Sequence, residues 1–246
     1  MSDNSQKAFD PAREESPALV VDALRRIVAH YGLWLCETDH QLGLEAALKA
    51  EKEAGDRLIP ILFKRLSKAL GIELENGLPK ALYDLDNESL NTLMRELSLC
   101  WLAADGVWFQ AVEKMGGMHD AKRVNDTCWT RFSPYEAARI MDLAGIEPGS
   151  GLDGLKKVLG LRLYSRINVQ EIGEETNNSF LFRMLDCRVQ SARKRKGLED
   201  YPCKSGGMVE YVNLARAVDP RIRVECVHCP PDDHPEDCYC AWRFSI

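Results

Sequence analysis

Residues 237–246 read DCYCAWRFSI, and the alternation along this stretch decides the fold class of the C-terminal part. Successive side chains of a β-strand point to opposite faces. One face then carries the thiol and apolar side chains Cys238, Cys240, Trp242, Phe244 and Ile246. The other carries Asp237, Tyr239, Arg243 and Ser245. The stretch therefore predicts a strand whose thiol-bearing face is turned toward a core.

The residues before this strand predict the rest of a small module, 161–246. Two extended segments separated by a turn-prone stretch indicate a hairpin, and two helical stretches follow before the last strand pair. The predicted strands are 163–172, 179–186, 221–228 and 237–246, and the predicted helices are 188–196 and 205–217. The order ββααββ predicts an α+β fold with a mostly antiparallel sheet.

Six of the nine cysteines lie in the last 60 residues and predict a metal-thiolate site. Pairing the last two strands puts Cys226 roughly opposite Cys240. Cys226 and Cys229 have the C-x₂-C spacing that lets two thiolates bind one ion. Cys187 at a strand end and Cys203 beside Pro202 are candidates for the remaining ligands. Zinc and an iron–sulfur cluster are both open as the bound group.

Two alternatives to a metal remain for these cysteines. No second C-x₂-C follows at zinc-ribbon spacing, so the thiols are also consistent with plain core packing or with a reactive or redox role. The other three cysteines, Cys36, Cys100 and Cys128, lie in helical pattern and are predicted to be small buried hydrophobic residues.

Basic residues near Cys187 predict an anion-binding element. Arg188, Arg193 and Lys194 are expected to hold a carboxylate beside the thiols. The competing interpretation is a solvated helix face.

A duplication relates the first and second parts of the helical region. At an ungapped offset of 74 residues, twelve positions are identical and one keeps an acidic residue. The pairs are Gly32/Gly106, Trp34/Trp108, Asp39/Glu113, Gly43/Gly117, Ala47/Ala121, Arg57/Arg131, Pro60/Pro134, Arg65/Arg139, Gly71/Gly145, Ile72/Ile146, Glu73/Glu147, Gly77/Gly151 and Leu78/Leu152. A constant offset over this length indicates a tandem repeat, with copies at 19–94 and 95–160.

Each copy of the repeat is predicted to be helical. Apolar residues recur at three- and four-residue spacing. Gly71 and Gly145 stand where a left-handed cap ends a helix, and Pro60 and Pro134 suit a first helical turn. The copies are expected to pack about a pseudo-two-fold axis.

A cleft between the two copies is a second candidate small-molecule site. Its predicted lining is Trp34, Trp108, Asp39, Asp105 and Glu113. Asp105 interrupts the apolar stretch 100–109, and a carboxylate in such surroundings needs a partner unless it faces water.

Composition narrows the class of protein. The net charge of −6 over 246 residues makes nucleic acid an unlikely partner. No apolar run approaches the roughly 20 residues that cross a bilayer. The polar start without an apolar segment predicts no secretory signal, a disordered tail at 1–18 and a cytoplasmic protein. Monomer and homodimer both remain open.

Several short stretches carry a resemblance to known families. They are DCRVQ (186–190), ARKRKGL (192–198), YPCK (201–204), CPPD (229–232), HP (234–235) and CAWRF (240–244). Through them, the part from roughly residue 95 to 246 resembles an uncharacterised bacterial and archaeal family of cytosolic proteins of unknown function. More distantly, the positions of Cys187, Cys203 and Cys240 look like the pattern of L-2-amino-thiazoline-4-carboxylic acid hydrolases and of relatives with a vinyl-reductase-type ligand-binding domain. The resemblance implies small-molecule binding and hydrolysis of a C–N or C–S bond.

The sequence thus predicts a metal-thiolate protein that binds a small anionic or sulfur-containing molecule, with hydrolysis by metal-activated water as the enzymatic form of this hypothesis. Arg188, Arg193, Lys194, Asp105 and Trp108 are the expected ligand-binding residues. The alternative is a non-catalytic ligand or redox sensor or carrier, with a structural metal or with cysteines that only pack.

Overall fold

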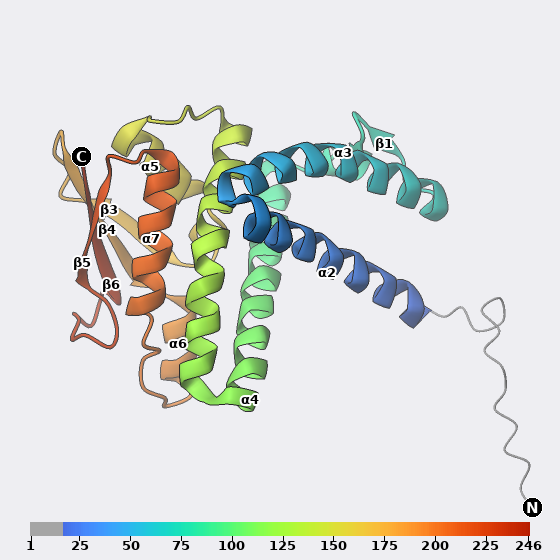
Figure 1. Cartoon of the computed structure of the whole chain (residues 1–246). Helices are drawn as coiled ribbons and strands as arrows, with labels where there is room; N and C mark the ends of the chain where they lie inside the picture. The colour runs from blue at the N-terminus through green and yellow to red at the C-terminus, as the bar shows by residue number, and fades with distance from the viewer. Residues whose placement is uncertain (1–16) are drawn as a thin grey trace, which may run out of the picture. The chain divides into compact units, whose positions relative to one another are not determined.

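The structure, a computed structural model, describes residues 17–246 and divides into two units at the boundary between Ile59 and Pro60 (Figure 1). The C-terminal module lies in the second unit. Its sheet contains β3 (Val169–Gly173), β4 (Ser179–Asp186), β5 (Arg223–His228) and β6 (Cys240–Ser245). The order is β3-β4-β6-β5, and all neighbouring strands are antiparallel. Because β6 lies between β4 and β5 and is antiparallel to both, the C-terminal ends of β4 and β5 meet the start of β6 at one end of the sheet.

Helices complete the module in the predicted order. They are α5 (Gly151–Leu161), α6 (Arg188–Arg195) and α7 (Lys204–Val218), with the short 3₁₀ helix η2 (Leu163–Arg166) before the sheet. The predicted α+β class and the order ββααββ are confirmed. The strand predicted at 163–172 starts late, because its first residues form η2 and β3 begins at Val169.

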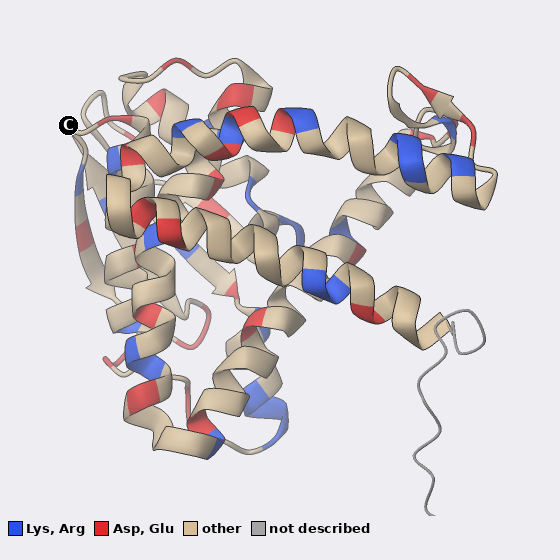
Figure 2. Ribbon diagram, turned by 45° about the vertical axis from the view of Figure 1, so that its right-hand side comes forward, with Lys and Arg blue, Asp and Glu red and all other residues tan. Residues whose placement is uncertain are grey.

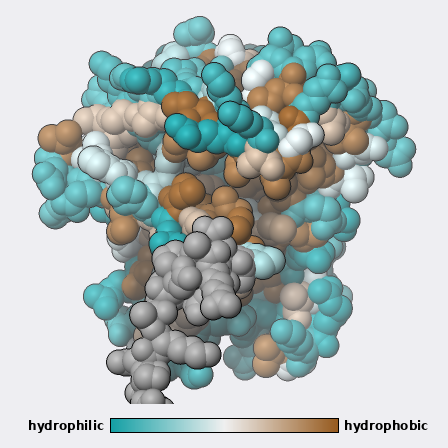
Figure 3. Space-filling view, turned by 90° about the vertical axis from the view of Figure 1, so that its right-hand side faces the viewer, coloured by the Kyte–Doolittle hydropathy of each residue, from teal (hydrophilic) through white to brown (hydrophobic). Residues whose placement is uncertain are grey.

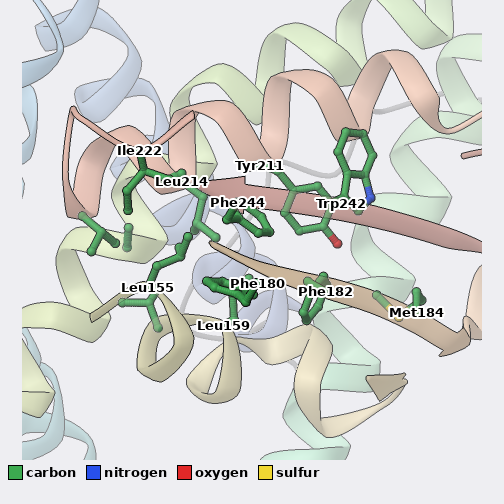
Figure 4. Close-up of a cluster of buried hydrophobic side chains, with 14 of the residues drawn as sticks. Leu155, Leu159, Phe180, Phe182, Met184, Tyr211, Leu214, Ile222, Trp242 and Phe244 are labelled. Atoms are coloured by element: carbon green, nitrogen blue, oxygen red, sulfur yellow. The ribbon is translucent and has the colours of Figure 1, made fainter. Parts of the chain in front are cut away.

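One face of the sheet packs on α5 and α7 to form the core. Figure 4 shows aromatic side chains of β4 and β6 meeting side chains of both helices. Phe180 and Phe244 stack at 5.1 Å, and Tyr211 of α7 lies 4.8 Å from Trp242, measured between ring centroids. The alternation predicted for Cys240, Trp242 and Phe244 is therefore confirmed, since all three belong to this core.

Cys238 departs from the predicted alternation. It precedes β6 and packs with Leu181 and Ala241 on the other face of the sheet. The strand begins only at Cys240, so the two-residue period does not extend back to Cys238.

Two helical hairpins precede the module and give the repeat its form. The first joins α2 (Pro17–Leu42) to α3 (Leu44–Leu70), and the second is α4 (Asn87–Ala144), which breaks at Gly117. The turn glycines Gly43 and Gly117, 74 residues apart, have φ of 86° and 80°. The helix-ending glycines Gly71 and Gly145 have φ of 69° and 62°. The helical tandem repeat in the predicted fold class is thus seen as two hairpins with matching turns.

The copies differ after their second helix. The first continues into the short strands β1 (Leu74–Glu75) and β2 (Leu78–Pro79) and the 3₁₀ helix η1 (Lys80–Leu82), whereas the second continues into α5. Pro60 and Pro134 lie inside α3 and α4 and not in a first turn, so that expectation was wrong. In both copies the helix continues through the proline despite the missing backbone donor.

The second hairpin packs on the module through α7, which lies between the sheet and α4 (Figure 1). Close approach depends on a glycine, because a Cβ at Gly206 of α7 would lie 3.1 Å from Asp126 Oδ1. This contact brings the middle of α4 next to the start of α7.

The first unit exposes apolar side chains. The middle of α2, between its charged ends, carries no charged residue (Figure 2), and its side chains Val28, Leu33 and Trp34 are exposed. Figure 3 shows hydrophobic side chains at the surface of the face that it draws. Cys36, Cys100 and Cys128, predicted to be buried, are exposed, because a small residue in a helix does not reveal which face it occupies.

Two further expectations concern the ends and the membrane. The predicted tail at 1–18 lies outside the described residues except for Pro17 and Ala18, which begin α2. Among residues 17–246, no helix combines the length and apolar character needed to cross a membrane.

Candidate functional site

Four cysteines lie where secondary-structure elements begin or end. Cys187 follows β4 and starts α6, Cys203 precedes the first residue of α7, Cys229 follows β5, and Cys240 begins β6. Because β4 and β5 end at the same end of the sheet where β6 begins, the topology brings these four positions together. We call Cys187, Cys203, Cys229 and Cys240 the thiol cluster.

Cys229 lies at the centre of the thiol cluster. Its Sγ is 3.5 Å from Sγ of Cys203, and Cys240 lies close enough to act on it electrostatically. Cys187 interacts electrostatically with both Cys240 and Cys203. Cys229 and Cys240 are buried, whereas Cys187 and Cys203 are partly exposed.

Hydrogen bonding makes the thiols unequal. The contact with Cys203 raises the pKa of Cys229, so Cys229 keeps its proton and donates it. The same hydrogen bond lowers the pKa of Cys203, and the Gln190 amide and Lys122 act in the same direction. Burial raises the pKa of Cys187 to about 12. The thiolate character of the cluster therefore concentrates on Cys203.

Gln190 of α6 holds the loop that carries Cys203. This buried side chain accepts a hydrogen bond from Tyr201 N and donates one to Tyr201 O, each at 2.8 Å. Its Nε2 also donates to Cys203 Sγ at 3.4 Å. On the other side, Lys204 N donates to Pro230 O at 2.9 Å, which ties the start of α7 to the loop after Cys229. Backbone and side-chain contacts thus fix the distance between the two thiols.

Cys226 shares a face with the cluster but pairs differently from the prediction. It was expected opposite Cys240, yet it lies opposite Trp242, and the ladder shifts between Cys226 and His228. The expected face is confirmed, because Cys226 packs against the core that contains Cys240. Burial raises the pKa of Cys226 to about 11, and Lys204 and Asp232 act on it in opposite directions.

Asp105 faces the same region from α4. Trp101, Asp105 and Phe109 are spaced four residues apart and so share one side of the helix. Asn125 Nδ2, from the second half of the hairpin, donates to Asp105 Oδ1 at 3.2 Å. The partner that the sequence required for Asp105 is therefore an amide, and burial raises the pKa of this carboxyl group.

Two tyrosines flank Asp105. The Tyr164 ring lies 4.7 Å from Trp101, and the Tyr201 ring lies 5.4 Å from Phe109, with Lys122 Nζ over the Tyr201 ring at 4.8 Å. Burial raises the pKa of both phenols, and Asp105 adds to the effect in each case. Tyr164 also interacts with Cys187, and Tyr201 with Cys203. We call Asp105, Tyr164 and Tyr201 the polar wall, since Asp105 acts on both tyrosines and these act on cysteines of the thiol cluster.

An ion triad is buried beside the polar wall. Arg162 Nε is 2.7 Å from Glu136 Oε2, and Arg162 Nη1 is 2.7 Å from Glu210 Oε1. Burial alone would lower the pKa of Arg162, but the two carboxylates outweigh it and raise that pKa. Burial raises the pKa of Glu210. The guanidinium lies 5.4 Å from the Tyr164 ring centroid, so the triad positions that tyrosine.

The other predicted ligand residues lie elsewhere. Trp108 is 73% exposed, like its repeat equivalent Trp34 at 67%. Arg188 and Lys194 are exposed on α6, and Arg193 Nε donates to Glu199 O at 2.7 Å. Lys122 instead acts on Cys203, and Lys204 acts on Cys226.

Sequence reasoning missed Gln190, Tyr164, Tyr201 and Lys122. For Gln190 and Tyr201, the signal was proximity in sequence to Cys187 and Cys203. Tyr164 and Lys122 gave none, because they reach the site only through the packing of η2 and α4. In residues 17–246, no group of three or more His, Cys, Asp or Glu side chains is arranged as a ready metal site.

Comparison with known proteins finds a match to a family model. A family model described as "Family of unknown function (DUF6125)" matches residues 10–86 and 82–246. The two matched segments meet near the junction of the repeat copies. No curated protein and no solved structure matches the chain.

Proposed function

We propose, from the premise that the chain belongs to the DUF6125 family of unknown function, that it is a metal-thiolate protein that binds a small molecule. The proposed ligands of the ion are Cys187, Cys203, Cys229 and Cys240. The observation that carries the proposal is the position of Cys229, whose Sγ lies 3.5 Å from that of Cys203 and which Cys240 also influences electrostatically. Four thiols supplied by three strand ends and one helix start fit the coordination number of a zinc-class ion.

The distance between sulfurs supports this ion class. Zn–S bonds of about 2.3 Å in a tetrahedron separate two sulfurs by about 3.8 Å. Sγ of Cys203 and Sγ of Cys229 lie at 3.5 Å, joined by a proton. Binding of the ion would replace that shared proton, since the ligands of zinc are thiolates. The proposal requires Cys187 and Cys240 to turn toward the ion.

The polar wall supplies the small-molecule side of the proposal. Asp105 offers a carboxylate in aromatic surroundings, and Tyr164 and Tyr201 offer phenol groups next to Cys187 and Cys203. These groups suit a small polar molecule that both donates and accepts hydrogen bonds. They replace Arg188, Arg193, Lys194 and Trp108 in the proposed ligand set, and Asp105 remains.

A hydrolase is the enzymatic form of the proposal. Cys187, Cys203 and Cys240 carry the distant resemblance to L-2-amino-thiazoline-4-carboxylic acid hydrolases, which supports hydrolysis of a C–N or C–S bond as the reaction class. An ion with three protein ligands would activate water at the fourth position, whereas an ion with four thiolates would be structural. We place the protein in the cytoplasm, where the thiols stay reduced.

Metal analysis tests the proposal. Protein purified under anaerobic conditions should contain about one ion per chain by elemental analysis and by native mass spectrometry. Cys187→Ser, Cys203→Ser, Cys229→Ser and Cys240→Ser should each lower the metal content, because each removes one ligand. Cys226→Ser is the matched control, since it lies on the same sheet face outside the cluster, and it should keep the ion. Metal-free protein that also fails to take up added zinc would overturn the proposal.

A further inference from the structure

A second property of the thiol cluster follows from two of its members without any metal. Sγ of Cys203 and Sγ of Cys229 lie at 3.5 Å, a separation that a modest rotation of either side chain closes to the roughly 2.05 Å of a disulfide bond. Their backbones are already held together, because Lys204 N donates to Pro230 O at 2.9 Å between the residues that follow each cysteine.

The two thiols differ in access. Cys229 is 1% exposed, so a molecule in solution cannot reach its sulfur. Cys203 is partly exposed on the loop before α7. An incoming reagent therefore meets Cys203 first, and Cys229 is reached only from Cys203.

The surroundings of Cys203 hold its sulfur beside that of Cys229. Gln190 Nε2 donates to Sγ of Cys203 at 3.4 Å, and Sγ of Cys229 lies 3.5 Å away. Cys203 stands at the N-terminus of α7, a helix of 15 residues. A hydrogen-bond donor and a helix N-terminus are features found around attacking cysteines.

We propose that Cys203 and Cys229 form a dithiol that reduces small disulfides by thiol–disulfide exchange. The Cys203 thiolate attacks one sulfur of a disulfide RSSR, which breaks the S–S bond and releases RS⁻ that takes up the proton lost by Cys203. The Cys229 thiol then loses its proton and attacks Sγ of Cys203. A Cys203–Cys229 disulfide forms, and the second RSH leaves with that proton.

The exchange balances in atoms and electrons. Two protein thiols give two electrons and two protons to RSSR, and the products are one protein disulfide and two RSH. The partner is a low-molecular-weight disulfide that reaches the partly exposed Cys203 before the start of α7. A bound ion on the same sulfurs would slow the exchange, so chelation should accelerate it.

Single-turnover exchange with 2-hydroxyethyl disulfide tests the inference. The full-length reduced protein is mixed with the reagent, with and without a chelator, and intact mass and peptide mapping follow the cysteines. Wild-type protein should lose the mass of two hydrogen atoms, gain a Cys203–Cys229 linkage and release two equivalents of thiol. Cys229→Ser should stop at a mixed disulfide on Cys203, and Cys203→Ser should leave Cys229 unmodified. Cys226→Ser should behave like wild type.

Three outcomes would overturn the inference. They are a mixed disulfide that persists on Cys203 in the wild type, a linkage between other cysteines as the main product, and equal reaction of Cys203→Ser and wild type. The result is independent of the proposed metal, because the chelated arm contains none. Protein that binds zinc but does not form the linkage after chelation refutes the exchange alone, and protein that forms the linkage but never binds zinc refutes the metal-thiolate proposal alone.

Discussion

Asn125 donates a hydrogen bond to Asp105 across the second helical hairpin, at 3.2 Å. Subtracting the repeat offset of 74 from both numbers gives Tyr31 and Glu51, and Tyr31 Oη donates to Glu51 Oε1 at 2.8 Å across the first hairpin. The residue types changed, but the bridged positions did not. The repeat therefore preserves the pairing of two helical positions, and in the second copy this pair includes Asp105 of the polar wall.

The turn glycines give a direct test of the repeat. Gly43 and Gly117 have positive φ, so Gly43→Ala and Gly117→Ala should each lower the free energy of unfolding by about 1 kcal/mol or more. Gly32 and Gly106 are the matched pair inside helices, and a Cβ at either meets nothing within 4 Å. Gly32→Ala and Gly106→Ala should stabilise by roughly 0.5–1 kcal/mol. Urea unfolding measures the stability of all four variants. Opposite effects for the two turn glycines, or for the two helix glycines, would contradict the equivalence of the repeat copies.

The sequence predicted the thiol cluster because its members mark element boundaries. The four cysteines flank segments whose periodicity is clear. The order ββααββ then brings the ends of those segments to one end of the sheet. Cys226 was predicted two residues out of register, because the loop between the two strands does not by itself fix their pairing, and the ladder shifts again only after Cys226, before His228. A bulge is a property of two strands together.

The polar wall was only partly predictable, for a different reason. The apolar stretch around Asp105 showed that the carboxylate needed a partner, but Trp101 and Trp108 on that stretch have similar propensities. Trp101 packs against Tyr164, whereas Trp108 is 73% exposed. Which side of a helix faces the module depends on α7, where Gly206 permits close approach. Long-range packing of this kind leaves no periodic trace in a helix that is apolar on several sides.

Asp105→Asn should separate stability from ligand binding. Burial raises the pKa of Asp105 in the fold, so the folded state disfavours the ionised form. Its contribution to stability therefore falls as pH rises through the unfolded pKa of about 3.9 and stays low above the folded pKa. Asn keeps an acceptor for Asn125 and removes the charge, so the variant should be as stable as wild type or up to about 1 kcal/mol more stable at pH 7.

Unfolding curves from pH 3 to pH 8 measure this difference, and Glu96→Gln on the exposed side of α4 serves as control. Any small molecule found to bind beside the thiols should bind the Asp105→Asn variant more weakly. A variant less stable than wild type at neutral pH would show that the carboxylate is better paired than its burial indicates.

Arg162 is expected to be the most sensitive polar residue of the module. Its guanidinium is 2% exposed and contacts Glu136 and Glu210. Arg162→Ala leaves two carboxylates buried without a cation, which should cost roughly 3–5 kcal/mol of unfolding free energy. Arg195→Ala on the exposed end of α6 should cost less than about 0.5 kcal/mol. Chemical denaturation followed by tryptophan fluorescence compares the two variants, and a loss below about 1 kcal/mol for Arg162→Ala would mean that the triad is not desolvated as the structure indicates.

Gly207 is expected to control the approach of α7 to the sheet. A Cβ at this position would lie 2.5 Å from Cζ2 of Trp242, a fully buried side chain. Gly207→Ala should therefore displace α7 or the indole and destabilise the module by about 1–3 kcal/mol. Gly160→Ala in α5 meets nothing within 4 Å and should be neutral or stabilising. Thermal unfolding measures both, and equal melting temperatures would contradict the close contact.

Asp219 should give the module an acid-sensitive anchor. The carboxylate is fully buried and accepts hydrogen bonds from Gly151 N at 3.1 Å and Arg221 N at 3.0 Å, and from the Arg221 guanidinium at 2.9 Å and 2.6 Å. The bonds from Arg221 are the main reason that the pKa of Asp219 falls to about 2. A folded pKa below the unfolded value of about 3.9 means that the ionised form stabilises the fold. The contribution is complete above about pH 4 and disappears as pH falls from there toward 2.

Asp219→Asn should lower the free energy of unfolding at pH 7 by about 1–3 kcal/mol, because charged hydrogen bonds are lost. The variant should also flatten the dependence of stability on pH between pH 4 and pH 2. Asp233→Asn in an exposed loop should leave both the level and the slope unchanged. Urea titrations at several pH values measure the two quantities, and an Asp219→Asn slope equal to that of wild type would show that another carboxylate is responsible for acid sensitivity.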